Sequence, residues 1–92
     1  MAKGNGYLGT SSIQTSKTNQ ELIPNAPENW TIGYKLVKFS FSNEQDCTVI
    51  INKGVTLFLK AGQGFEVGHD DAPITSFVIK EASITFNWIG MY

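Results

Sequence analysis

Few side chains in this sequence could do chemistry, and the densest polar group is His69-Asp70-Asp71. Two carboxylates beside a histidine could bind a divalent cation or act as an acid–base pair. Adjacent residues in an extended loop point in different directions, however, so they converge poorly on one ion. The simpler interpretation is a solvated loop whose aspartates accept hydrogen bonds from nearby backbone N–H groups. We therefore predict no metal site and no cofactor.

The other candidate for chemistry is Cys47, which could be a nucleophile with His69 as its base. Cys47 alternates with Val49 and Ile51 on the apolar face of a predicted strand, where a free cysteine behaves as a small buried hydrophobe. No glycine-rich loop precedes a helix, so the sequence offers no phosphate-binding loop. We assign no catalytic residue and predict that the protein is not an enzyme.

Four aromatic residues could stack on sugar rings in a carbohydrate-binding face: Trp30, Tyr34, Trp88 and Tyr92. Trp88 also alternates with core positions, which favours a place in the core. Trp30 lies where two regions of different composition meet, and there it could close one end of the fold.

The elements that must position these residues change character near residue 33. Residues 33–92 alternate between apolar and polar side chains with a period of two, broken by Gly, Asn and Pro turns every 8–12 residues. The pattern predicts strands over residues 37–42, 47–51, 55–60, 65–67, 74–80 and 84–89. We expect an all-β fold, a small antiparallel sandwich or barrel of about six strands with an extended N-terminal arm.

The expected arm is residues 1–32, and residues 33–92 form the expected compact domain. The first 23 residues are rich in Gly, Ser, Thr, Asn and Gln and show neither helical nor strand periodicity, so they should not bury a core of their own. A connector with two prolines follows them. We expect the arm to attach through its spaced apolar residues, and its removal to leave the domain folded: Tyr7, Leu8, Ile13, Leu22 and Ile23.

Two apolar residues fall on the polar side of their strands, Ile50 and Phe58. If the two strands pair, both residues could lie on one outward face, either as a subunit contact or under a second packed sheet. A core of about 60 residues is marginal without a disulfide or a metal, and one cysteine forms no intrachain disulfide. We therefore predict a homo-oligomer or a subunit of a larger particle.

Charge and hydropathy exclude several function classes. The net charge is −1, only 16% of residues are charged, and the seven lysines are dispersed with no arginine, so nucleic-acid binding is disfavoured. No apolar run approaches the roughly 18 residues of a membrane span. The N-terminus lacks the apolar run of a secretory signal peptide, and a single unpaired cysteine fits synthesis in a reducing cytosol.

Three stretches together resemble small β-domains of tailed-bacteriophage virion proteins, namely residues 47–54, 57–65 and 72–79. Such domains occur in capsid decoration, head-fibre and tail-tip components. The resemblance covers about residues 34–92, rests on pattern, and carries no catalytic motif. It implies a structural role on a capsid or tail, a location in the virion after synthesis in the host cytoplasm, and attachment through the N-terminal segment. The competing hypothesis is a small carbohydrate-binding module that holds a host-surface sugar.

Overall fold

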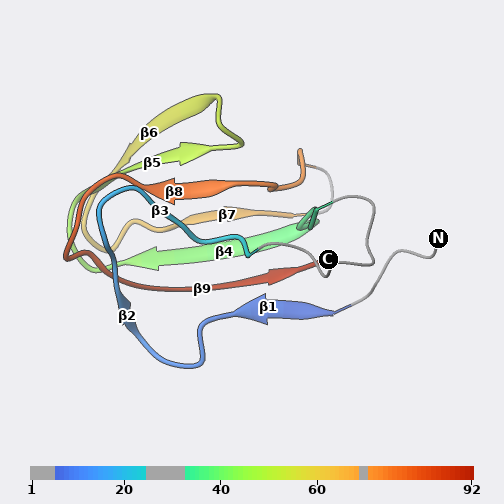
Figure 1. Ribbon diagram of the computed structural model, residues 1–92, viewed down its shortest axis with the longest axis horizontal. Coiled ribbons are helices and arrows are strands. Elements are labelled where there is room, and N and C mark those ends of the chain that lie inside the picture. The colour runs from blue at the N-terminus through green and yellow to red at the C-terminus, as the bar shows by residue number, and fades with distance from the viewer. Residues whose placement is uncertain (1–5, 25–32, 69–70) are drawn as a thin grey trace.

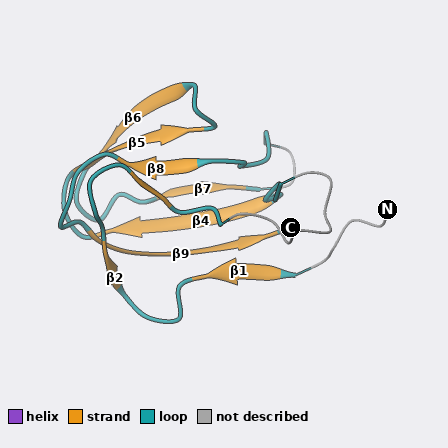
Figure 2. Cartoon of the chain, in the orientation of Figure 1, coloured by secondary structure: helices purple, strands orange, loops and turns teal. Residues whose placement is uncertain are grey.

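The computed structural model describes residues 6–24, 33–68 and 71–92, and this part of the chain contains only strands and loops (Figures 1 and 2). Two antiparallel sheets face each other, so the predicted all-β sandwich is confirmed. In chain order the strands are β1 (Tyr7–Gly9), β2 (Gln14–Thr15), β3 (Gln20–Glu21), β4 (Lys38–Asn43), β5 (Cys47–Ile51), β6 (Val55–Leu59), β7 (Phe65–Val67), β8 (Phe77–Ile79) and β9 (Thr85–Met91).

Each sheet mixes segments that lie far apart in the chain. The five-stranded sheet has the order β1-β9-β4-β7, and β2 also pairs with β9. The four-stranded sheet has the order β3-β8-β5-β6. The strands β4 to β9 correspond to the six that the alternation predicts, because a strand with one buried face must alternate.

The turns between these strands are held by asparagine side chains. Asn52, with φ of 52°, accepts hydrogen bonds from the N–H groups of Thr75 (2.7 Å) and Ser76 (3.2 Å). Asn43 is buried and accepts one from the N–H of Gly64 (2.9 Å). Gly64 has φ of 70°, and a Cβ there would lie 2.7 Å from the Phe41 carbonyl oxygen, so glycine is required.

The N-terminal segment differs from the expected arm. Residues 6–24 lie along the domain, with β1 and β2 paired to β9 and β3 paired to β8, and Figure 1 shows the blue β1 beside the red β9. The buried Ser16 Oγ donates to the Glu81 carbonyl (2.7 Å) and accepts from the Ile84 N–H (3.0 Å). The Glu21 carboxylate accepts from the Phe77 N–H (2.7 Å). Backbone pairing and polar side-chain hydrogen bonds hold this segment in place, together with the buried Leu22 and Ile23 at its end. The predicted boundary at residues 32 and 33 falls beside residues 25–32, outside the described residues.

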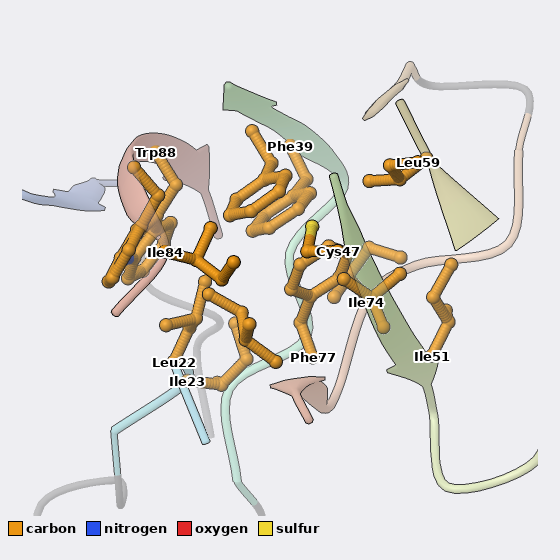
Figure 3. Close-up of a cluster of buried hydrophobic side chains, with 14 of the residues drawn as sticks. Leu22, Ile23, Phe39, Cys47, Ile51, Leu59, Ile74, Phe77, Ile84 and Trp88 are labelled. Atoms are coloured by element: carbon orange, nitrogen blue, oxygen red, sulfur yellow. The ribbon is translucent and has the colours of Figure 1, made fainter. Parts of the chain in front are cut away.

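One hydrophobic core lies between the two sheets. Phe77 from β8 meets Phe39 and Phe41 from β4, with ring centroids 4.9 Å and 4.8 Å away. Leu22 and Ile23 enter the same cluster from the N-terminal segment, as Figure 3 shows. The core therefore joins both sheets and the segment that precedes residue 25.

Candidate functional site

The predicted polar loop is only partly described, since His69 and Asp70 lie outside the described residues. Asp71 accepts a hydrogen bond from the Gly68 N–H at 2.9 Å, and its own N–H donates to the Gly68 carbonyl at 3.1 Å. This carboxylate thus closes a local turn. Among the residues that the structure describes, no three His, Cys, Asp or Glu side chains gather where they could hold a metal ion.

Cys47 lies in the core between the sheets, where its side chain is 1% exposed. Burial, and after it the nearby carboxylates of Glu81 and Asp46, raise the pKa of the thiol to about 11. A thiol with such a pKa stays protonated near neutral pH and is a poor nucleophile. The geometry fits the interpretation of Cys47 as a small buried hydrophobe.

The aromatic residues predicted to face a ligand do not form one exposed surface. Trp88 is only 7% exposed and packs against Phe39 at 5.6 Å between ring centroids, so its assignment as a ligand-facing aromatic is wrong. Tyr34 and Tyr92 are half-buried, and their rings meet at 4.8 Å and 59°. Trp30 lies outside the described residues. The position of Trp88 on the inward side of β9 follows from its alternation with Phe86.

The apolar residues predicted to anchor the N-terminal segment fall into three environments. Leu22 (8% exposed) and Ile23 (7%) belong to the core of this chain, so their assignment to attachment is corrected. Leu8 is half-buried against the core. Tyr7 (72%) and Ile13 (62%) are exposed.

The outer face of the five-stranded sheet carries an open groove of about 250 Å³, the Tyr7 groove. Its outward side chains come from four strands: Tyr7, Lys38, Ser40, Glu66, Ile89 and Met91. The strand register sets Tyr7 directly opposite Met91, with Ile89 one outward position further along β9. Tyr7, Met91 and the 54% exposed Ile89 thus form an apolar strip. The strip shares the groove with the charged side chains of Lys38 and Glu66.

The outer face of the four-stranded sheet carries a second apolar group, the Phe58 patch, made of Ile50, Phe58 and Val78. Ile50 is directly opposite Val78, and Phe58 is diagonal to Ile50 because it pairs with Thr48. Phe58 is 59% exposed, whereas Ile50 and Val78 are half-buried. The five-stranded sheet packs on the opposite face, and no described strand covers the Phe58 patch.

One margin of the sandwich, where β6 and β7 end their sheets, leaves core side chains partly open. A depression of about 310 Å³ lies there, and its apolar lining comes from Ile51, Val55, Phe65, Val67 and Ile74. Val55 is 53% exposed although the alternation of β6 places it on the inward side. Periodicity tells which face a residue is on, but not whether the opposite sheet extends far enough to cover it.

Sequence reasoning missed Ile89 and Val55 as exposed apolar residues. The signal for Ile89 was present, because Phe86 and Trp88 on the inward side of β9 place Ile89 on the outward side. The sequence held no comparable signal for Val55, whose exposure depends on the reach of the facing sheet.

Among residues 6–24, 33–68 and 71–92, no helix is long and apolar enough to cross a bilayer. Comparisons with protein-family models, with curated proteins and with solved structures find no match to this chain.

Proposed function

We propose that this protein is a non-catalytic assembly subunit that docks onto a larger particle through the Tyr7 groove. The observation that carries the proposal is the pair of exposed apolar side chains Tyr7 (72%) and Ile89 (54%), which both line the groove and are diagonal neighbours on the outer face of the sheet. Contiguous exposed apolar side chains edged by polar ones mark protein contact sites. Lys38 and Glu66 also line the groove, so a partner could form ion pairs with a positive and a negative side chain there.

The particle that we propose is the capsid or tail of a tailed bacteriophage, which places the protein in the virion. This step rests on the resemblance of residues 34–92 to small β-domains of such particles. Attachment then uses Tyr7 and the sheet face beside it, whereas Leu22 and Ile23 serve the core.

The test is incorporation into particles produced from the genome that encodes this chain. A Tyr7→Ala/Ile89→Ser double variant removes two side chains whose burial is worth about 1.5–3 kcal/mol each, so the amount bound should fall at least about tenfold. Ile13→Ser is the matched control, since Ile13 is 62% exposed but is not part of the groove. Full incorporation of the double variant, or absence of the wild-type protein from purified particles, would contradict the proposal.

A second candidate is carbohydrate binding in the same groove. The exposed Tyr7 ring beside Lys38, Ser40 and Glu66 combines a stacking surface with hydrogen-bonding groups. Titration calorimetry against a panel of glycans tests it, with Tyr7→Ala expected to abolish any binding. A panel without heat of binding leaves the assembly proposal as the function of this face.

A further inference from the structure

The edge strands of the two sheets differ in how well they are protected. The edges β1, β2, β3 and β7 are two or three residues long, and β3 and β7 carry Glu21 and Glu66. β6 is an edge strand of five residues, Val-Thr-Leu-Phe-Leu, with neither a charge nor a proline. Short, charged or proline-bearing edges resist pairing with other chains, whereas a long apolar edge favours it. Figure 1 shows β6 at the margin of the sheet.

The backbone groups that β6 presents to this margin can be identified. On β5, the Thr48 carbonyl accepts a hydrogen bond from the Lys80 N–H. Just beyond the strand, the Asn52 N–H donates to the Ser76 carbonyl. The even-numbered residues of β5 therefore direct their backbone hydrogen bonds toward β8. The odd-numbered residues of β5 therefore bond β6, through their partners Val55, Leu57 and Leu59. Thr56 and Phe58 consequently direct their N–H and C=O groups away from β5, toward the edge of the sheet where no described strand pairs with β6.

These outward N–H and C=O groups can pair with the same groups of a second copy that is related by a two-fold axis at Leu57. An antiparallel second β6 centred there sets Thr56 opposite Phe58 in both directions, which allows four backbone hydrogen bonds. Lys60 falls opposite Gly54 rather than opposite another lysine, and no charge lies inside the strand. The second copy would also lie over the half-buried Leu57 and next to the open margin lined by Val55.

We infer that β6 pairs antiparallel with β6 of a second copy of this chain, joining two four-stranded sheets into one continuous sheet. Phe58 of each copy then packs beside Thr56 of the other, on the outer face that carries the Phe58 patch. The contact is small, so we expect a weak dimer that dissociates on dilution. This inference rests on the proposed function, because it supplies the self-association of an assembly subunit and leaves the Tyr7 groove free for the particle.

Sedimentation equilibrium of the full chain over a wide concentration range tests the dimer. The mass should rise with concentration from 10.1 kDa toward twice that value. Phe58→Lys should raise the dissociation constant at least about tenfold, through lost burial and the repulsion of two lysines on one face. Ile13→Lys is the matched control, since Ile13 is similarly exposed (62% against 59%) but lies on the N-terminal segment, outside β6 and outside the Tyr7 groove, and its dissociation constant should not change.

Thr56→Pro supplies an independent variant, because it removes an N–H that points to the free edge and leaves the bonds to β5 intact. It should also keep the chain monomeric, with its circular dichroism spectrum unchanged. Equal dissociation constants for wild type, Phe58→Lys and Thr56→Pro would overturn the pairing.

The register is tested by cysteine cross-linking under mild oxidation with diamide. At the axis, two Leu57→Cys residues have Cα atoms about 4.5 Å apart, within the range of a disulfide, whereas two Thr56→Cys residues are about 7–8 Å apart. Leu57→Cys should therefore form a disulfide-linked dimer and Thr56→Cys should form little. Random collision would reverse that order, because Thr56 is the more exposed of the two, and such a result would overturn the register.

The outcomes separate this inference from the proposed function. A chain that stays monomeric at all concentrations but binds its particle overturns the β6 pairing alone. A chain that forms the Leu57-centred dimer but binds no particle keeps the pairing and removes the proposed function.

Discussion

At the scale of single residues, Asn43 joins two loops of the chain, the one between β4 and β5 and the one between β6 and β7. Its side-chain amide donates to the carbonyls of Gln45 (2.8 Å) and Lys60 (2.9 Å), and its oxygen accepts from the Gly64 N–H (2.9 Å). A buried polar side chain is tolerated only when its hydrogen bonds are made, and here they hold the loops that follow β4 and β6. The sequence shows Asn43 only as part of a polar turn.

Cys47 should make the free energy of unfolding depend on pH in the alkaline range. Its pKa is raised from 9.0 to about 11 in the folded protein, chiefly by burial, so the folded state keeps the thiol proton that the unfolded chain releases. Below about pH 9 both states are protonated, and from there toward about pH 11 the free energy of unfolding should fall as the pH rises.

Urea unfolding at several pH values measures this slope, with Cys47→Ala as the control. Lysine and tyrosine titrations affect both proteins alike, so the variant should lose only the part of the slope due to the thiol. The native protein should also react slowly with Ellman's reagent at pH 8. A reaction as fast as that of the urea-unfolded chain would contradict the buried thiol.

At the scale of elements, the N-terminal segment is a set of short edge strands rather than a separate arm. We predict that Leu22→Ala lowers the free energy of unfolding by about 2–5 kcal/mol, as for other buried leucines. Ile13→Ala, on the same segment but 62% exposed, should change it by less than about 0.5 kcal/mol. Chemical denaturation compares the two variants, and equal small effects would show that the segment contributes no core.

At the scale of the whole molecule, the two sheets share one core and should unfold together. Phe77 from the four-stranded sheet contacts Phe41 from the five-stranded sheet, with ring centroids 4.8 Å apart. We expect Phe77→Ala to cost about 3–5 kcal/mol, a large part of the stability of a domain this small.

Amide hydrogen exchange tests whether the loss is shared. In Phe77→Ala, protection should fall by similar factors in β9 and in β5, which belong to different sheets. The exposed Ile13→Ala variant should leave both unchanged. Loss of protection in one sheet alone would mean that the sheets are independent units.

The sequence by itself determined the six strands from β4 to β9, the all-β class and the inward position of Cys47. Alternation has a period of two and is read within five or six residues, so these features are local. Tertiary structure decided the features that depend on distant partners. β1 is Tyr-Leu-Gly in a polar stretch without alternation, and it exists because Tyr7 pairs with Met91 at the other end of the chain.

The exposure of apolar side chains depends partly on the local pattern and partly on tertiary structure. Trp88 and Ile89 are adjacent in the sequence, yet one is 7% and the other 54% exposed, which the alternation of β9 does indicate. The exposure of Val55 and the free edge of β6 follow instead from the order of the strands and the reach of the facing sheet. Strand order is set by long-range packing among many apolar faces of similar character, so a local pattern does not specify it.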